Sequence, residues 1–431
     1  MIKKIKKMVK SKVAKNTMWI LAERIIQMLL TLIVGSLTAR YLGPSNYGLL
    51  NYGASIVAIF TAITKLGLDS IIVKELVERK KENGSIIGSA MIMRLASSFL
   101  SIILIFVVLL VFKPNDKLVI LLTVLQSISL LFQSYELFDL WFQSNLNSKF
   151  TSIAKTIAYI IVSLYKIFLL ICSKSIIWFA ISTTLDYLLI FAILIIMYKK
   201  NNGQKLEYSY KEAKGLLNKS YHFIISSLMV ILYMQMDKIM IGNMIDEYHV
   251  GLYSAATTIC TLWAFIPEAI INSFRPIIYS LKKENQPLYV KRLKLLYCII
   301  FWLGICFCLI ISIFSKYIIL LLYGNDYLLA QIPLIIAVWY TAFAYVGVAR
   351  NIWIVSENKN SFAKKFTLIG AVVNLILNFI LIPLYGIKGA AVATLLSQIS
   401  VVIIAPLLFK ETRVSTKYII ESIMFKGLYE K

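Results

Sequence analysis

The sequence predicts an all-α polytopic membrane protein with twelve transmembrane helices, six in each half of the chain. Three observations predict this fold class. The 431-residue chain is 59% hydrophobic, whereas a soluble domain is typically about 45–50% apolar, and its mean hydropathy is +0.79. Apolar runs of about 20 residues, enough to cross a bilayer as a helix, recur along the chain. Most Lys and Arg residues lie between these runs.

Twelve apolar runs qualify as spans, six before and six after a long polar connector. The first six form an N-lobe over residues 17–198, and the last six form a C-lobe over residues 221–409. The expected spans are 17–41, 47–66, 86–112, 118–142, 150–173, 175–198, 221–241, 250–274, 295–314, 332–355, 366–384 and 389–409. The ninth span has an uncertain end, because the apolar stretch from Ile318 to Tyr323 could extend it or form a separate interfacial piece.

Positive charge supports this topology. With the N-terminus in the cytoplasm, 32 of the 45 Lys and Arg residues fall in inner segments and 6 in outer ones. Such a bias is typical of cytoplasmic loops and predicts cytoplasmic termini, a cytoplasmic linker over 199–220 and a cytoplasmic tail over 410–431. It also accounts for the net charge of +24 without nucleic acid as a partner, since the sequence has no aromatic-basic RNA-binding pattern.

Residues 1–16 form a basic, amphipathic N-terminus. It resembles the charged region of a signal peptide, but the apolar segment that follows is longer than the usual one of about 7–15 residues, so we expect it to be retained. Ile2, Ile5, Val9 and Val13 are spaced for one helical face, which favours a position on an anionic membrane surface.

The two halves share a short pattern. YGLLNYGA at residues 47–54 opens the second span, and VGLYSAA at residues 250–256 opens the eighth. Both segments follow an outer turn, and they occupy equivalent places among their six spans. This correspondence indicates parallel repeats related by an axis normal to the membrane.

Ionisable residues inside the spans are the main functional signal. A Lys or Arg at the centre of a span costs about 2.5–3.5 kcal/mol on insertion scales, so such residues should face a cavity or a partner. In the first span, Arg24 lies on a heptad-spaced stripe with Thr17, Thr31 and Thr38, which favours a polar lumen-facing side. The alternative is that Glu23 and Arg24 only neutralise neighbouring groups; the role of Glu23 stays open.

We expect cations at two depths to bind an anionic cargo in turn. Arginine suits phosphate because its planar fork can donate two hydrogen bonds. For Arg275 and Arg350, which lie towards span ends, snorkelling to the interface is an alternative. The candidate substrate-binding residues are Arg24, Arg94, Lys166, Lys238, Arg275 and Arg350.

A second group of polar residues is rich in oxygen. Asp237 lies in the seventh span, Asn374 and Asn378 share a face of the eleventh at i and i+4, and Thr394 lies in the twelfth. A carboxylate, amide carbonyls and a hydroxyl suit a small hard cation such as sodium. The alternative is that these residues hydrogen-bond between helices, as such residues often do in membranes.

Several classes of activity lack support in the sequence. We find no phosphate-cradling glycine loop, no nucleophile-elbow motif and no His or Cys pattern suited to a metal. No expected external loop exceeds about a dozen residues, whereas an enzyme acting on lipid-linked sugars outside the cell would normally need a larger one. We therefore expect a secondary-type transporter rather than an enzyme, with no bound cofactor.

Three motifs at span junctions resemble one protein family. They are RYLGP with YG at residues 40–44 and 47–48; DKIMIG with VGLYSAA at 237–242 and 250–256; and NFILIP with GIKGAA at 378–383 and 386–391. They resemble segments of the bacterial flippases of O-antigen and capsule repeat units, and the resemblance covers nearly the whole chain. The superfamily also includes multidrug and toxic compound extrusion carriers and peptidoglycan lipid flippases.

The resemblance implies a function. It implies two six-helix lobes with pseudo-two-fold symmetry around a central cavity, which rock between inward-open and outward-open states. These lobes would move an undecaprenyl-pyrophosphate-linked oligosaccharide across the bacterial cytoplasmic (inner) membrane for surface polysaccharide biosynthesis, with a polysaccharide polymerase and a chain-length regulator as further partners. Some relatives place a sodium ion among the seventh, eleventh and twelfth spans, which strengthens the sodium hypothesis for Asp237 and its neighbours; Na⁺ or H⁺ would couple transport. Asn378 is uncharged, so a site that demands two carboxylates is doubtful.

Two other functions remain as alternatives. A cation-coupled multidrug antiporter shares the architecture, but it would favour acidic and aromatic groups over the basic ones buried here. A membrane-embedded polysaccharide polymerase or ligase is disfavoured by the short outer loops.

Overall fold

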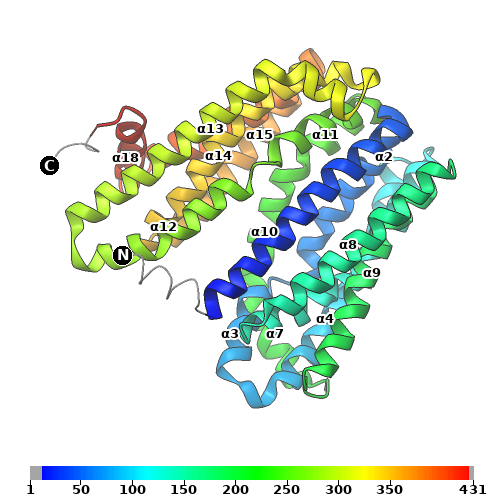
Figure 1. The fold of residues 1–431 in the computed structure, drawn as a ribbon, viewed down its shortest axis with the longest axis horizontal. Coiled ribbons are helices and arrows are strands. Elements are labelled where there is room, and N and C mark those ends of the chain that lie inside the picture. The colour runs from blue at the N-terminus through cyan, green and yellow to red at the C-terminus, as the bar shows by residue number, and fades with distance from the viewer. Residues whose placement is uncertain (1–11, 427–431) are drawn as a thin grey trace. The chain divides into compact units, whose positions relative to one another are not determined.

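The computed structural model describes residues 12–426, and this part of the chain is largely helical (Figure 1). Most of the expected amphipathic N-terminus lies outside the described residues. The helices of the first half are α2 Lys12–Thr64, α3 Asp69–Glu78, η1 Lys80–Glu82, α4 Asn83–Phe112, α5 Lys117–Ser127, α6 Ser129–Phe132, η2 Gln133–Tyr135, α7 Glu136–Ser144, α8 Ser148–Ile171 and α9 Ile176–Lys200. Those of the second half are α10 Tyr210–Met244, α11 Glu247–Thr261, α12 Phe265–Glu284, α13 Gln286–Leu322, η3 Asn325–Ala330, α14 Gln331–Ser356, α15 Asn360–Tyr385, α16 Ile387–Ile399, the π-helical η4 Ser400–Ile404, α17 Ala405–Leu408 and α18 Arg413–Ile423.

The expected all-α polytopic fold is confirmed. Within the described residues, 11 helical segments are long and apolar enough to cross a membrane, and the first of them, Asn16–Thr64, contains two expected spans. These two spans meet inside α2 at Gly43, whose φ of 69° interrupts the helix just before Pro44. The other segments each coincide with one expected span. α13 runs to Leu322, so the ninth span continues through most of the apolar stretch that could have been separate.

Three expected spans are not continuous α-helices. The fourth is divided into α5, α6, η2 and α7, the eighth is divided between α11 and α12, and the twelfth passes through η4 before it ends in α17. Two segments expected to be polar connections are helical: α3 follows the second span, and α10 begins at Tyr210, inside the expected linker. In the twelfth span the interruption is a π-helical turn, one of the recognised causes of a helix kink.

The chain forms two compact units. Unit 1 comprises Met1–Leu42 and Leu49–Ile231, and unit 2 comprises Gly43–Gly48 and Leu232–Lys431. The first repeat motif therefore contributes its start to unit 2. There, backbone packs on backbone: a Cβ on Gly48 would meet the Glu247 carbonyl oxygen at 1.7 Å, and one on Gly251 would meet the Pro44 carbonyl oxygen at 2.0 Å. Only glycine permits this approach.

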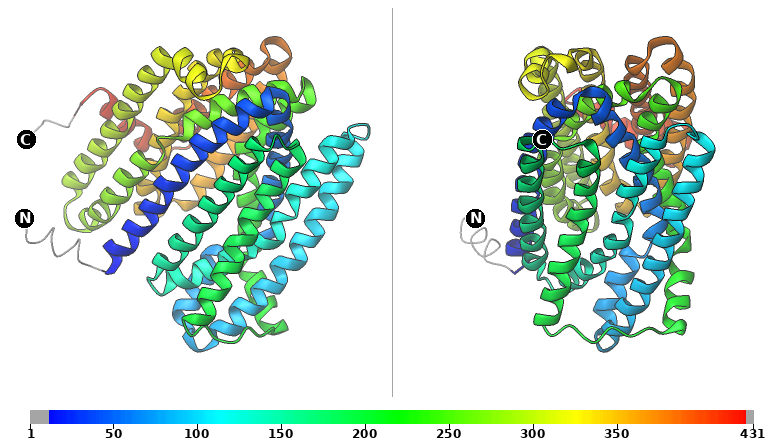
Figure 2. Two further views of the ribbon diagram at one scale, coloured as in Figure 1. Left: turned by 45° about the vertical axis from the view of Figure 1, so that its right-hand side comes forward. Right: turned by 90° about the vertical axis from the view of Figure 1, so that its right-hand side faces the viewer.

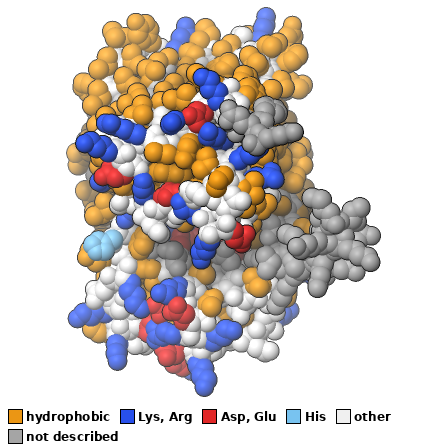
Figure 3. All heavy atoms as spheres, turned by 90° about the vertical axis from the view of Figure 1, so that its left-hand side faces the viewer, with side chains coloured by type: hydrophobic (Ala, Val, Ile, Leu, Met, Phe, Trp, Pro, Cys, Tyr) orange, Lys and Arg blue, Asp and Glu red, His pale blue; other side chains and the backbone are white. Residues whose placement is uncertain are grey.

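Each unit has a core of its own. In unit 1, side chains of α3, α4, α7, α8 and α9 meet around the fully buried Phe138 and Phe142. In unit 2, side chains of α12, α13, α14 and α15 meet around the fully buried Tyr289 and Tyr297. Figures 1 and 2 show α8 beside α9 in the first unit, and α13 beside α14 in the second. On the face drawn in Figure 3, hydrophobic side chains cover most of the upper part, and blue and red charged side chains gather in the middle and lower parts.

The expected linker is fixed to unit 1. Gly84 N donates to Gln204 Oε1 at 2.8 Å, and Ser209 N donates to Ser89 Oγ at 3.0 Å. A Cβ on Gly84 would lie 2.2 Å from the Lys205 carbonyl oxygen, so the connector crosses the start of α4 where that helix has no side chain. This segment is therefore an integral part of the unit.

A cluster of ion pairs holds the start of α10 to unit 1. The Arg79 guanidinium contacts Glu212 at 2.7 and 2.8 Å, Glu75 at 3.2 Å, and Glu82. Lys219 Nζ lies 2.5 Å from Glu75 Oε1. The Lys219 ammonium and the Arg79 guanidinium hold the pKa of Glu75 below its usual range, despite its burial. Its three carboxylate partners raise the pKa of Arg79.

Candidate functional site

The Asp237 carboxylate is the centre of a buried hydrogen-bond cluster in unit 2. Its Oδ1 accepts from Asn378 Nδ2 at 2.6 Å and from Asn374 Nδ2 at 3.1 Å. Its Oδ2 accepts from the Tyr253 hydroxyl at 2.7 Å and from the Thr394 hydroxyl. The four residues of the expected oxygen-rich group thus lie together, as the sequence indicated, and the structure adds Tyr253.

The positions of these residues follow from local helix geometry. Asn374 and Asn378 are one turn apart on α15, and Asn378 Nδ2 donates to Asn374 Oδ1 at 3.1 Å. Thr394 on α16 also donates to the Ala390 carbonyl of the preceding turn, at 3.1 Å. Tyr253 lies in the VGLYSAA motif at the start of α11. Its motif was noticed in the sequence, but an aromatic side chain in an apolar run carries no signal that it donates to a carboxylate.

Burial makes these hydrogen bonds important. Asp237 is 7% exposed, Asn374 1% and Asn378 0%. A carboxylate taken out of water is costly unless donors surround it, and four uncharged donors do so here. Lys238, the next residue on α10, is half-buried and interacts electrostatically with Asp237.

The cluster has one feature that fits a cation. Asn378 Oδ1 is buried and accepts no hydrogen bond from any residue in the described part of the chain. It lies in a cluster with a carboxylate and two hydroxyls, all of them oxygen ligands that hard cations prefer. Residues 12–426 contain no group of three or more His, Cys, Asp and Glu side chains placed to hold a metal.

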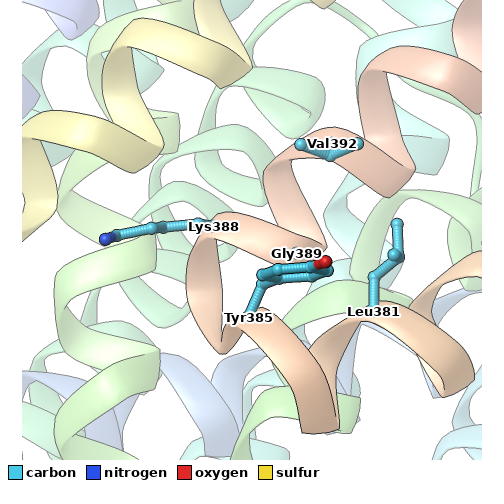
Figure 4. A pocket seen from close by; sticks show the side chains of 5 residues that line it. All are labelled: Leu381, Tyr385, Lys388, Gly389 and Val392. Carbon is cyan, nitrogen blue, oxygen red and sulfur yellow. The ribbon is translucent and has the colours of Figure 1, made fainter.

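A cavity of about 210 Å³ lies at the turn between α15 and α16 (Figure 4). Leu381 and Tyr385 line it from α15, and Lys388, Gly389 and Val392 line it from α16. The surface that lines it is apolar, and in Figure 4 the Lys388 ammonium points away from the other labelled side chains. The Asp237 cluster is not part of its lining.

In unit 1, Arg94 is buried between carboxylates. It is 2% exposed, and its guanidinium donates to Asp69 Oδ1 and, at 3.4 Å, to Glu136 Oε2. Lys65 Nζ lies 2.8 Å from Glu136 Oε1. The expectation that Arg94 would have a partner or a cavity is met by two acidic partners. Lys65 was not among the expected residues, because it follows the last residue of its helix and resembles an ordinary span-flanking lysine.

The other candidate cations lie in different surroundings. Lys166 on α8 is half-buried and interacts electrostatically with Asp186 on α9. Asp186 Oδ1 is buried and has no hydrogen-bond partner among the described residues. Arg24 and Arg275 are exposed. Glu23, beside Arg24, is 7% exposed and interacts electrostatically with Lys155 and Asp139.

Arg350 has a backbone partner. Its Nη1 donates to the carbonyl oxygens of Val401 and Val402 at 2.9 and 3.1 Å, within the π-helical η4, and its guanidinium lies 4.6 Å from the centre of the Phe366 ring. At 3% exposure it does not snorkel. Arg350 thus donates to two carbonyls of the π-helical turn, a rare element that occurs mostly as a single turn.

Comparisons with known proteins agree with this fold. The sequence model of a family described as "Polysaccharide biosynthesis protein" matches residues 13–282. A probable low-salt glycan biosynthesis flippase of Haloferax volcanii is 30% identical over 196 residues, 44% of this chain and 40% of the relative. The capsular polysaccharide biosynthesis protein CapF of Staphylococcus aureus is 26% identical over 163 residues, 37% of this chain and 41% of that protein. The chain thus aligns with about 40% of the length of these curated relatives.

Two solved structures illustrate the fold. The lipid II flippase MurJ in an inward closed conformation has a TM-score of 0.70 at 17% identity, and the match covers 95% of this chain and 90% of that one. An inward-facing multidrug resistance transporter of the MATE family has a TM-score of 0.66 at 14% identity, with 92% and 96% covered. At these identities the similarity establishes the fold.

Proposed function

Because the chain belongs to the polysaccharide biosynthesis protein family, we propose that it is a transporter that moves lipid-linked oligosaccharides across a membrane. The family match over residues 13–282 is the observation that carries this proposal. The full proposal names the cargo and the direction. The cargo is an undecaprenyl-pyrophosphate-linked repeat unit for surface polysaccharide, and it passes from the inner to the outer leaflet of the bacterial cytoplasmic membrane. Both termini are then cytoplasmic, and a polysaccharide polymerase and a chain-length regulator use the product.

The geometry of the buried cations supports an anionic cargo. Arg94 and Lys65 in unit 1 are two cations within reach of the same carboxylate. A pyrophosphate head group needs such partners at membrane depth, while its polyprenyl chain stays in lipid. In this scheme Arg24 and Arg94 hold the head group first, and Lys166 and Lys238 interact with it later. Arg275, which is exposed like Arg24, is a further candidate. Arg350 has a weaker claim, because its guanidinium donates to backbone carbonyls.

The Asp237 cluster is the proposed coupling site. A sodium ion would be bound by Asp237 and Thr394 with the free Oδ1 of Asn378, and Asn374 would orient the carboxylate. An ion that binds only one conformation shifts the transport cycle towards it. Proton coupling through the same carboxylate is the alternative.

Purified protein tests the sodium site. An ion that binds only the folded protein raises the free energy of unfolding by about 2.7 kcal/mol when the ion concentration is 100 times the dissociation constant. We expect the free energy of unfolding in detergent to be higher in NaCl than in choline chloride. Asp237→Asn should remove this difference. Equal stability in the two salts would exclude sodium as the coupling ion.

Deletion of the gene tests the transport proposal. We expect lipid-linked repeat units to accumulate on the inner face of the membrane and surface glycan to disappear. Restoration by the wild-type gene and by Arg413→Ala, but not by Arg24→Ala at equal expression, would place Arg24 on the transport path. Arg413 is a suitable control because it is exposed and its Nε donates only to the nearby Leu407 carbonyl among the contacts described. Accumulation of unpolymerised units on the outer face would instead indicate a polymerase or ligase.

The multidrug antiporter remains the second candidate, because the chain has the fold of such transporters. It predicts that the deletion strain becomes sensitive to cationic drugs while its surface glycan is unchanged. The buried Arg94 disfavours it, since a cationic drug would have to lie near a buried guanidinium.

A further inference from the structure

Two interrupted helices meet inside unit 1. α2 ends at Thr64, the backbone enters the left-handed region at Leu66 and Gly67 (φ 53° and 63°), and α3 begins at Asp69. The fourth expected span is interrupted before α7, which begins at Glu136. α3 packs against α7, and α4 packs against both. Both helix starts therefore lie beside Arg94, near the middle of α4.

The start of α3 favours negative charge. A helix N-terminus carries unpaired N–H groups and a partial positive charge, and α3 has an acidic residue, Asp69, in its first turn. Glu136 begins α7 directly after η2, and its N–H donates to the carbonyls of Gln133 and Ser134. The chain thus supplies an anion of its own to the start of α3, and Glu136 adds a second carboxylate beside it.

Two cations face the same carboxylates. Arg94 Nη2 pairs with Asp69 Oδ1 and Nη1 with Glu136 Oε2, while Lys65 Nζ lies 2.8 Å from Glu136 Oε1 and 4.0 Å from Asp69 Oδ2. The four side chains form a closed set with no net charge. Because the two positive charges are matched by two negative ones, no cation is left buried without a partner, which would cost folding free energy.

Arg94 differs in accessibility from its carboxylate partners, whereas the Lys65 side chain is 29% exposed and lies, like them, within reach of solvent. The Arg94 side chain is 3% exposed, whereas the side chains of Glu136 and Asp69 are 22% and 45% exposed. Arg94 Nε is also buried and has no hydrogen-bond partner within the described residues, so its donors are not all used. The guanidinium is fixed in place, while the carboxylates lie where solvent or a ligand reaches them.

We propose that Asp69 and Glu136 occupy a phosphate-binding site and that an anionic phosphate group displaces them from Arg94 and Lys65. A tetrahedral phosphate can accept from a guanidinium fork and an ammonium together. The geometry of these four side chains supports the binding of an anion. The assignment of that anion as an isoprenoid pyrophosphate rests on the proposed function. The internal carboxylates keep the site neutral when no phosphate is bound.

Binding to purified full-length protein tests the site. The probes are inorganic pyrophosphate, farnesyl pyrophosphate and farnesol, measured by isothermal titration calorimetry in detergent. Removing one competing carboxylate as Glu136→Gln keeps a hydrogen-bond acceptor for Arg94 but removes a charge. We expect this variant to bind pyrophosphate about tenfold more tightly than the wild type, because one negative charge that repels the bound anion is removed.

Matched variants control for net charge and folding. Glu78→Gln also removes one negative charge, this time from α3. Glu78 is exposed and pairs only with Lys74, at 3.9 Å, among the ion pairs described. We therefore expect this variant to bind pyrophosphate with wild-type affinity. Arg94→Lys keeps the charge but not the fork and should weaken binding about tenfold. The proposal is overturned if Glu136→Gln binds no more tightly than Glu78→Gln, or if Arg94→Lys binds like the wild type.

The probes also separate the source of the phosphate. Tighter binding of farnesyl pyrophosphate than of pyrophosphate, with no binding of farnesol, supports a lipid-linked pyrophosphate. Equal binding of both anions supports the site with a free anion as its ligand, and competition by phosphatidylglycerol in nanodiscs supports a phospholipid head group. The last two outcomes support the anion site but count against the flippase proposal. Failure of the anion site and failure of the flippase proposal therefore give different results.

Discussion

Replacement of Asp237 should show how much the buried cluster contributes to the stability of unit 2. In Asp237→Ala, the two amides and two hydroxyls that donate to the carboxylate lose their acceptor. Hydrogen bonds between helices in membranes average about 0.6 kcal/mol and reach about 1.7 kcal/mol. Four such losses amount to about 2–4 kcal/mol of unfolding free energy.

The replacement Asp237→Asn should cost much less, below about 1 kcal/mol. The asparagine carbonyl can still accept from the amides of Asn374 and Asn378. Its NH₂ group would face the hydroxyls of Tyr253 and Thr394, and a hydroxyl can rotate to accept instead of donate. Thr394→Val, which removes one donor, should cost about 0.6–1.7 kcal/mol.

The assay is reversible unfolding of the purified protein in mixed micelles, followed by tryptophan fluorescence against the mole fraction of a denaturing detergent. The control is Ser226→Ala, because Ser226 shares α10 with Asp237 but donates only to the His222 carbonyl among its described contacts. The reasoning would be refuted if Asp237→Ala and Asp237→Asn were equally stable, since the cost would then not come from the lost acceptor.

Three further predictions concern other parts of the chain. Arg350→Leu should destabilise the protein by about 2–4 kcal/mol, because two carbonyls of η4 lose a buried charged donor; an unfolding midpoint equal to that of wild type would contradict this. The pKa of Glu75 is lowered by Lys219 and Arg79, so its contribution to stability is present above the ordinary pKa of about 4.5 and is lost as the pH falls through the lower folded value. The free energy of unfolding, measured between pH 7 and pH 3, should fall as the pH falls, and it should fall less in Glu75→Gln. The same fall in that variant as in the wild type would contradict this prediction. Asp246 caps α11 by accepting from the His249 N–H at 2.8 Å, so Asp246→Ala should cost about 1 kcal/mol while Asp246→Asn costs little; equal losses in the two variants would show that the cap is not the cause.

The candidate site in unit 2 was partly predictable. Asn374 and Asn378 share a face whenever their segment is helical, so their pairing follows from the helix period alone. That Asp237 and Thr394 would lie beside them depended on which helices pack together, which the helix period does not determine; the family resemblance only strengthened the sodium hypothesis for this group. Tyr253 could not be predicted, because aromatic residues in spans are mostly packing residues and only the direction of its hydroxyl makes it part of the cluster.

By itself, the sequence determined the all-α polytopic fold and the twelve-span pattern. Apolar run length and the placement of Lys and Arg are local properties that the bilayer selects directly. Tertiary structure decided where helices break and which charges meet. Nothing in the order of residues shows that Arg94 lies between Asp69 and Glu136, or that Arg350 reaches the carbonyls of η4. A buried charge is stabilised by whatever partner packing brings within hydrogen-bond distance, and that partner can be 25, 42 or 51 residues away.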